Sequence, residues 1–374
     1  MKKTIALLLS AVLLCMSAAC SPKSSSGTET AASETLASET SGTEKVKEQS
    51  DKEQPDDVLK SYGFKGVVSL TKDGEVIYQY VNGKDSGGNA LTVDSAMYIG
   101  SVSKQFCAAS IIMLRDKGKL SVDDTLDKYF PEYEAAKKLT VRNLLTMRSG
   151  ILDMVNEGPV EGVSYENTED KNTAVIKEWI FSQPLKFEPD SAYAYSNSNY
   201  FLLADIVKQI SGKSYHDFVR ENIFKPLGMS HSGFVEEVTD DPAWAEGLAR
   251  GEGNTSVEPP GLANGAGDVA SNAADMDAWM AGLSDGTVVS KESFREMTEN
   301  YSTDSGASYG YGLMGMAYDG TGHPGAIGTY GALDYINPER GLRLFIASNK
   351  ASSQSYIDSL PSALLKSFIE ENNP

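Results

Sequence analysis

The chain has 374 residues and carries 52 acidic and 33 basic side chains, which give it a formal net charge of −19 at pH 7. Such a charge repels phosphate backbones, so nucleic acid is excluded as a partner. A hydrophobic content of 40% is close to that of globular proteins and predicts a buried core. The three cysteines, at positions 15, 20 and 107, are too few for a disulfide framework, and their spacing fits no thiolate zinc site.

Residues 1–19 have the pattern of a secretory signal peptide, in which two lysines precede an apolar run at 5–14 and small residues stand directly before Cys20. The run is too short to cross a membrane. Small residues before a cysteine resemble a bacterial lipobox, with Ser17 where a leucine is usual. We therefore expect secretion across the bacterial cytoplasmic membrane and a lipid anchor at Cys20 that holds the protein at the cell surface. The alternative is an ordinary cleaved signal peptide that leaves Cys20 as a spare thiol.

Residues 20–57 are predicted to form a disordered tether. From Ser21 to Asp57 the chain is rich in Ser, Thr, Glu and Lys and has no aromatic residue, so it cannot bury enough surface to offset the entropy of ordering. As a flexible coil it would span about 35 Å on average. Residues 58–374 show no second low-complexity break and no internal repeat, which predicts one folded domain.

The predicted elements of this domain begin with a β-hairpin. Alternating β-branched and aromatic residues indicate strands at 64–70 and 75–81, separated by a short turn. Helical periodicity then dominates residues 102–300, where Gly118 and Gly212 are expected to end two helices. The first part of the domain therefore supplies one edge of a sheet and a long helical insertion.

Strand patterns return near the C-terminus, at 309–316, 330–336 and 342–348, and a final amphipathic helix follows that Pro361 is expected to interrupt. Strands at both ends with helices between them predict an α+β fold. Its antiparallel sheet would be formed by N- and C-terminal strands with flanking helices and an inserted all-helical lobe. Active sites favour the seam between two such parts.

Catalysis by a serine hydroxyl needs a base, and the chain has only three histidines and no G-x-S-x-G motif. Ser101 and Lys104 offer a different base. They are spaced i and i+3 at the start of a predicted helix, so their Cβ atoms would lie about 5 to 6 Å apart and the amine can reach the hydroxyl. The helix dipole favours a neutral amine there. Alone, the pair is a weak signal, because serine is the commonest helix N-cap and lysine is common on helices.

Two further motifs hold residues suited to acyl transfer. Tyr195 can relay a proton to a leaving group, and Asn197 can accept from an ammonium group and donate to a substrate carbonyl. His323 and Gly325 precede a predicted strand, where a glycine lets a substrate approach the backbone. Each has an ordinary explanation as well: Asn197 as a helix cap, Tyr195 as a core residue and the His-Pro-Gly segment as a turn.

The order S-x-x-K, Y-x-N and H-x-G along the chain resembles that of the penicillin-recognising serine hydrolases. This superfamily includes class C β-lactamases, D-alanyl-D-alanine carboxypeptidases, D-aminopeptidases and related esterases. The resemblance runs from about Val58 to Ile369, and four further stretches carry it, at 139–150, 187–200, 226–229 and 309–312. It implies a β-lactamase/DD-peptidase-like fold for the α+β domain.

The resemblance also implies a mechanism without metal or cofactor. Ser101 would form a covalent ester, with Lys104 and Tyr195 sharing its proton and Asn197 holding both Lys104 and the substrate amide. The oxyanion hole would consist of the backbone amides of Ser101 and Ala326. With the H-x-G residues His323 and Gly325, these positions are the candidate catalytic and substrate-binding residues.

The sequence departs from the family pattern at a few positions. The family often has His where Asn143 and Met147 stand and Gly where Asp190 stands, and we expect these to be scaffold positions. Typical β-lactamases carry Lys-Thr-Gly in place of His323-Pro-Gly, whereas His in this slot is similar to some carboxypeptidases and D-aminopeptidases. Cys107, three residues after the lysine of the first motif, is expected to be a small core residue rather than a nucleophile.

The sequence predicts a serine hydrolase of the cell surface that acts on D-Ala-type peptides, β-lactams or small esters, with peptidoglycan as a candidate partner. The alternative is a penicillin-binding sensor or sequestering module that is acylated without useful turnover. Within the enzyme class, carboxylesterase and D-aminopeptidase activity remain open. If His323 faces the site with an ordinary pKa near 6.5, recognition of a substrate carboxylate should strengthen as the pH falls from about 7.5 to 6.

Overall fold

The computed structural model describes residues 54–235, 258–302, 305–350, 357 and 359–369. The chain divides into two units, Met1–Lys52 and Glu53–Pro374. The predicted signal peptide, Cys20 and all but the last residues of the predicted tether lie outside the described residues. None of the helices in the described ranges is long and apolar enough to cross a membrane.

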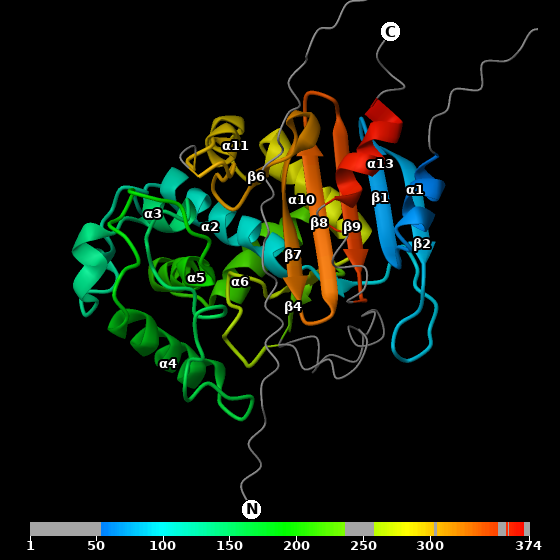
Figure 1. Cartoon of the computed structure of the whole chain (residues 1–374). Coiled ribbons are helices and arrows are strands. Elements are labelled where there is room, and N and C mark those ends of the chain that lie inside the picture. Colours follow the sequence, from blue (N-terminus) through cyan, green and yellow to red (C-terminus); the bar gives the residue numbers. More distant parts are fainter. Residues whose placement is uncertain (1–53, 236–257, 303–304, 351–356, 358, 370–374) are drawn as a thin grey trace, which may run out of the picture. The chain divides into compact units, whose positions relative to one another are not determined.

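A six-stranded antiparallel sheet organises the second unit (Figure 1). Its order is β2-β1-β9-β8-β7-β6, so the N-terminal hairpin pairs with the last strand of the chain. Val68 of the first strand lies opposite Ile346 of the last one. This arrangement confirms the predicted sheet of N- and C-terminal strands. Its strands are β1 (Gly66–Lys72), β2 (Glu75–Asn82), β6 (Met314–Gly315), β7 (Thr321–Ile327), β8 (Tyr330–Asn337) and β9 (Leu342–Ser348).

Side chains alternate between the two faces along each central strand of this sheet, and helices cover both faces. On β9, Leu344 and Ile346 face the terminal helices α1 (Pro55–Ser61) and α13 (Leu360–Ile369), while Phe345 belongs to the larger core on the other face. Helix α10 (Ala273–Asp285) packs on that second face against β1, β8 and β9. Figure 1 shows the terminal helices and α10 on opposite sides of the strands.

The region between the two halves of the sheet is mainly helical, as predicted. Gly212 ends α5 in the left-handed conformation, and Gly118 follows α2 with positive φ. The α-helices are α2 (Lys104–Asp116), α3 (Val141–Leu145), α4 (Glu169–Ser182), α5 (Asn197–Ser211), α6 (Tyr215–Val219), α7 (Lys225–Leu227) and α11 (Lys291–Thr298). Single turns of other helix types are η1 (Gly100–Ser103), η2 (Leu126–Lys128), η3 (Glu134–Lys138), η4 (Arg220–Phe224) and η5 (Ala317–Asp319).

The inserted region is not wholly helical, because it also contains a small antiparallel sheet of order β3-β5-β4. Its strands are β3 (Met97–Tyr98), β5 (Val269–Ser271) and β4 (Gly233–Phe234). Strands of two or three residues are too short to show an alternating pattern in the sequence. The small sheet matters for the site, since β3 leads directly into η1 and fixes where that turn begins.

Three predicted boundaries are corrected by the structure. Helix α1 begins at Pro55, inside the range assigned to the tether, because proline suits a first helical turn and Asp56 and Asp57 complement the helix dipole. Pro361 does not interrupt the last helix but lies in its first turn. The His-Pro-Gly segment is part of strand β7 rather than a turn before a strand.

The scaffold departures from the family pattern compensate one another. Asp190 has φ of 65°, a conformation that costs glycine little. Its side chain accepts a hydrogen bond of 2.7 Å from Asn143 Nδ2, and Arg148 donates to its carbonyl oxygen. Met147 also has positive φ, and its Sδ accepts from the backbone N–H of Ser196 at 3.4 Å.

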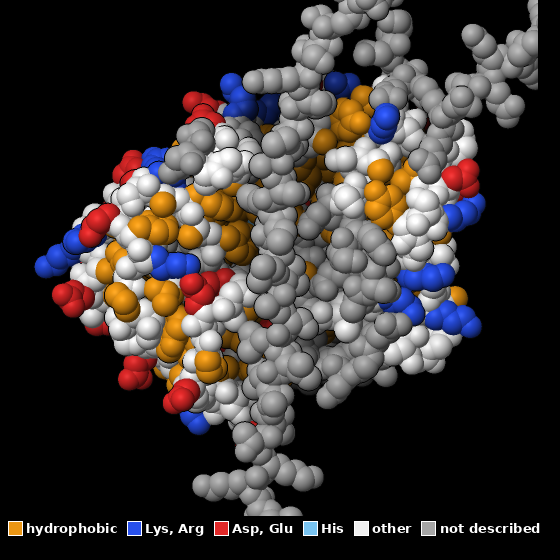
Figure 2. Space-filling view, viewed as in Figure 1, with side chains coloured by type: hydrophobic (Ala, Val, Ile, Leu, Met, Phe, Trp, Pro, Cys, Tyr) orange, Lys and Arg blue, Asp and Glu red, His pale blue; other side chains and the backbone are white. Residues whose placement is uncertain are grey.

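On the face shown in Figure 2, acidic and basic side chains are interspersed over the helical part.

Candidate active site

Ser101 lies on the turn η1, where two backbone segments from distant parts of the chain touch. A Cβ atom at Gly325 of β7 would lie 2.0 Å from the carbonyl oxygen of Ile99 and 2.9 Å from the nitrogen of Ser101. A Cβ atom at Gly100, which has φ of 51°, would lie 2.6 Å from the nitrogen of Ala326. Only glycine permits this approach at both positions. The backbone segments that carry the nitrogens of Ser101 and Ala326 therefore lie against each other.

Lys104, the first residue of α2, is buried with 0% exposure. Its Nζ lies 3.0 Å from Ser101 Oγ, 2.8 Å from Asn197 Oδ1 and 2.6 Å from the carbonyl oxygen of Ala266. The amine therefore has three polar neighbours from three segments of the chain. The expected contact between lysine and serine is present.

Burial determines the charge of this amine. Removal from water lowers the pKa of Lys104 from 10.5 to about 7, while Asp153, Cys107 and Asp268 act in the opposite direction. The hydrogen bonds are compatible with both forms, because an ammonium would donate to all three oxygens. The neutral form, which burial favours, uses the same neighbours differently. The amide oxygen of Asn197 and the carbonyl oxygen of Ala266 can only accept, and they take the two hydrogens of a neutral amine. The third neighbour, the serine hydroxyl, is the one that can donate, so it meets the lone pair.

Asp153 belongs to the site, although the sequence analysis did not single it out. It is 3% exposed and accepts from Asn197 Nδ2 at 3.2 and 3.0 Å, one distance for each carboxylate oxygen. Asn197 is the first residue of α5 and makes no capping bond, so its interpretation as a helix cap is wrong. The chain has 52 acidic residues, and no motif distinguishes Asp153 from the others.

Tyr195 packs against the lysine, with Lys104 Nζ 4.9 Å from the centre of its ring. Burial raises the pKa of Tyr195 well above 10, while a hydrogen bond with the Ser101 side chain acts in the opposite direction. The phenol is therefore protonated at neutral pH. Of the two expected proton carriers, the lysine is the one that is neutral enough to accept the serine proton.

His323 is placed at the site but not in the state that the sequence suggested. It is 1% exposed and packs near the rings of Tyr195 and Tyr309, at centroid distances of 6.0 and 5.8 Å. Burial and the nearby charge of Lys104 lower its pKa to about 3. An imidazole in this environment is neutral between pH 6 and 7.5. The expectation of carboxylate recognition that strengthens over this range, through protonation of His323, is therefore wrong.

A second buried acid, Asp334 on β8, lies behind His323. Its Oδ1 accepts from the backbone N–H of His323 at 2.9 Å and from Gln105 Nε2 at 2.6 Å. Gln105 follows Lys104 in sequence, so this carboxyl group links the start of α2 to strand β7. Its Oδ2 is buried and has no hydrogen-bond partner among the described residues. Burial raises the pKa of Asp334 to about 7.

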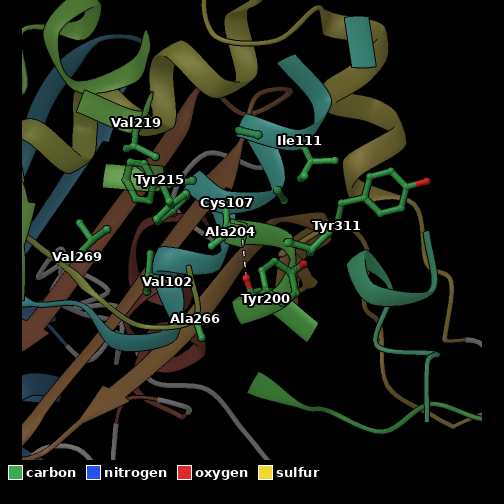
Figure 3. Packing of buried hydrophobic residues seen from close by; sticks show 14 of the residues in the cluster. Val102, Cys107, Ile111, Tyr200, Ala204, Tyr215, Val219, Ala266, Val269 and Tyr311 are labelled. Carbon is green, nitrogen blue, oxygen red and sulfur yellow. Dashed lines mark hydrogen bonds between the residues drawn. The ribbon is translucent and has the colours of Figure 1, made fainter. Parts of the chain in front are cut away.

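Cys107 fits the core interpretation. It is fully buried, its Sγ lies 3.6 Å from the carbonyl oxygen of Tyr200, and burial raises the pKa of the thiol. Figure 3 shows it pointing into a packed group that includes Val102 and Ala204. A protonated, enclosed thiol is a poor nucleophile.

In the described ranges, no group of three His, Cys, Asp or Glu side chains could hold a metal ion.

Comparison with known proteins links this arrangement to a family. The family model described as Beta-lactamase matches residues 45–365. The chain is 32% identical over 288 residues to the putative penicillin-binding protein PbpX of Bacillus subtilis, covering 75% of this chain and 67% of that protein. It is 29% identical over 279 residues to the D-aminopeptidase of Brucella anthropi, covering 70% of this chain and 51% of that one.

A solved structure agrees with these relatives. D-amino acid amidase from Ochrobactrum anthropi SV3, in complex with L-phenylalanine, superposes with a TM-score of 0.73 at 25% identity. The superposition covers 85% of this chain and 99% of the amidase chain. The chain thus spans nearly all of the amidase, about two thirds of PbpX and about half of the D-aminopeptidase.

The buried carboxyl group of Asp334 makes a prediction about stability. Its folded pKa is raised, so between about pH 4 and 7 the folded state holds a proton that the unfolded state has lost. The free energy of unfolding should therefore fall as the pH rises through this range, by roughly 1 kcal/mol per pH unit. Asp334→Asn removes this contribution. We expect the melting temperature of the variant to decline less from pH 5 to 8 than that of the wild type. His323 is present in both proteins and should contribute equally to the pH dependence of both melting temperatures. Parallel curves of melting temperature against pH would contradict the raised pKa of Asp334.

Proposed function

The chain belongs to the beta-lactamase family of serine hydrolases, and we propose that it cleaves amide or ester bonds of D-amino-acid-type substrates through a covalent ester on Ser101. The observation that carries this proposal is the position of Lys104 Nζ, 3.0 Å from Ser101 Oγ and fully buried. A neutral amine whose lone pair meets a serine hydroxyl is a general base for that hydroxyl. The remaining residues of the site then have roles around this pair.

Acylation begins when Ser101 Oγ attacks the substrate carbonyl and its proton passes to Lys104 Nζ. The bond from oxygen to carbon forms, and the bond to the leaving amine or alcohol breaks after the tetrahedral intermediate. Tyr195, which remains protonated, can give its proton to the leaving group and regain one from the Lys104 ammonium. Asn197 holds Lys104 through its Oδ1. Water later attacks the ester by the reverse sequence of proton transfers.

The negative charge of the tetrahedral intermediate needs donors that are already in place. The backbone amides of Ser101 and Ala326 are suited to this, because Gly100 and Gly325 allow the two segments that carry them to touch. Peptide N–H groups are fixed by the chain and need no reorganisation during the reaction. This geometry supports the proposed oxyanion hole.

The choice of substrate class rests on charge and on the relatives. His323 is neutral, Pro324 has no side-chain donor, and Lys104 is enclosed by three protein oxygens, so none of the three offers a free positive charge to a substrate carboxylate. Two relatives are by name a D-aminopeptidase and a D-amino acid amidase. We therefore favour D-aminoacyl amides or esters over D-Ala-type peptides with a free carboxylate and over β-lactams.

The cellular location belongs to the same proposal. A signal peptide at 1–19, a lipid at Cys20 and a tether to about residue 54 would place this hydrolase at the outer surface of the bacterial membrane. Stable anchoring takes two acyl chains, which a lipidated cysteine carries. Peptidoglycan or another D-alanine-bearing polymer of the envelope would then be within reach.

The nucleophile assignment is tested by labelling. Ser101→Ala should abolish covalent labelling by a fluorophosphonate, because the variant lacks the serine hydroxyl that lies 3.0 Å from the buried amine. Cys107→Ala is the matched control, since it changes the same helix region and removes the nearby thiol, and it should label like the wild type. Label that persists on the Ser101 variant, at the same rate, would overturn the assignment.

Turnover separates an enzyme from a module that is only acylated. Intact-mass measurements after a pulse of a D-aminoacyl ester should show an adduct on Ser101 that disappears as product accumulates. An adduct that persists for hours with stoichiometric product would instead support the sensor or sequestering function. The same assay with D-aminoacyl amides, D-Ala-D-Ala peptides and penicillin compares the substrate classes directly.

The anchor is tested by changing the cysteine. Cys20→Ser should move the protein from the membrane fraction to the soluble fraction of cells, because the single attachment point is lost. Its specific activity should be unchanged, since every candidate site residue lies between Ser101 and Ala326. A variant that stays with the membranes, or that loses specific activity, would show that the anchor and spacer assignment is wrong.

A further inference from the structure

We propose that Asp153 is a positioning residue of this active site, which orients the Asn197 amide so that the lone pair of Lys104 is left for Ser101. The inference rests on the proposed function and extends it to a residue outside the three motifs. Asp153 does not contact the serine. It acts through Asn197, and its effect should be visible in the strength of the base.

The first support is the geometry of the carboxylate. Both oxygens of Asp153 lie within 3.2 Å of Asn197 Nδ2, at 3.2 and 3.0 Å. The backbone N–H of Val155 donates to Oδ1 at 3.0 Å, and Asn156 Nδ2 donates to Oδ2 at 2.6 Å. Three donors thus hold the two carboxylate oxygens of a side chain that is 3% exposed. Such a group is fixed in position and accepts only.

The second support is the consequence for Asn197. Because a carboxylate cannot donate, the NH₂ end of the Asn197 side chain must face Asp153 and the oxygen end must face Lys104. The neutral amine then gives its two hydrogens to Asn197 Oδ1 and to the carbonyl of Ala266. If the amide were reversed, its NH₂ end would face the amine and require the lone pair. The serine proton would then have no acceptor.

The third support is charge. Among the groups around Lys104, Asp153 makes the largest contribution that favours the ammonium form and opposes burial. The other titratable groups near the amine are Cys107 on the same helix, Asp268 before β5, Tyr195 and Tyr200 on the α5 side, and His323 on β7. The tyrosines and the cysteine are protonated and His323 is neutral at pH 7, since burial shifts each pKa. Asp153 therefore keeps the base from becoming too weak to take a proton.

The test is the pH dependence of acylation in the full-length protein. The second-order rate of fluorophosphonate labelling should rise with pH as Lys104 loses its proton. Asp153→Asn keeps the size and one acceptor oxygen but removes the charge, so the ammonium form loses support. We expect the acid limb of the rate–pH curve, the part over which labelling speeds up as Lys104 loses its proton, to move to lower pH by about half a unit or more. The plateau rate should fall by about tenfold or more, because the base is weaker and the amide is less well oriented.

Two further variants make the result specific. Asp205→Asn removes a carboxylate of α5 that pairs with Lys177 at 3.0 Å, away from the site, and it should leave both the limb and the plateau unchanged. Asn197→Leu removes the side chain that Asp153 orients, and its acid limb should also move to lower pH, because the ammonium form loses the Oδ1 acceptor. This variant carries the test if Asp153→Asn does not fold.

The outcomes separate this inference from the proposed function. A lower plateau with an unmoved limb in the Asp153 variant would mean that the residue only supports the loop, and the inference would be overturned. An equal shift in Asp205→Asn would overturn it as well, since any lost charge would then suffice. Failure of the wild type to label at Ser101 would instead remove the proposed function.

Discussion

The burial of one amine holds this site together. Lys104 has no access to water, and its three polar neighbours come from the turn η1, from the start of α5 and from the segment before β5. A charged ammonium in that position is costly because it is removed from water, and the neutral amine can bond to all three neighbours. The protein thereby obtains a base near neutral pH without using any of its three histidines. The fold has to keep these three segments in contact for this to work.

The main sheet supplies that constraint. Its strands come from both ends of the chain, and β1 pairs with β9 in the middle of the sheet. Strand β7, which contacts the turn η1, is joined to β1 through β8 and β9. The close approach of Gly100 and Gly325 lies at this junction, and Asp334 ties it to α2 through Gln105. Packing of the terminal strands and the geometry around Ser101 are thus parts of one structure.

The sequence predicts those features that long patterns or paired motifs encode. The first hairpin, the strands at 330–336 and 342–348, and the contact between Lys104 and Ser101 all follow from periodicity or spacing. Strand β7 escaped prediction because Gly322, Pro324 and Gly325 are poor strand formers. The two glycines are present because neighbouring backbone atoms leave no room for a Cβ atom at either position. Asp153 escaped because a single carboxylate in an acidic chain gains its role only when folding places it beside Asn197.

The central claim is that burial gives Lys104 a pKa near 7, and NMR can measure this directly. In protein with ¹³C-labelled lysine, the ε-methylene signals report the protonation of each amine, and Lys104→Arg assigns the signal of interest. We expect this one signal to titrate at about pH 7, well below the value near 10.4 of a lysine in water. A Lys104 signal that titrates with the other lysines would contradict the account, because the amine would then be charged at neutral pH and could not accept the proton of Ser101.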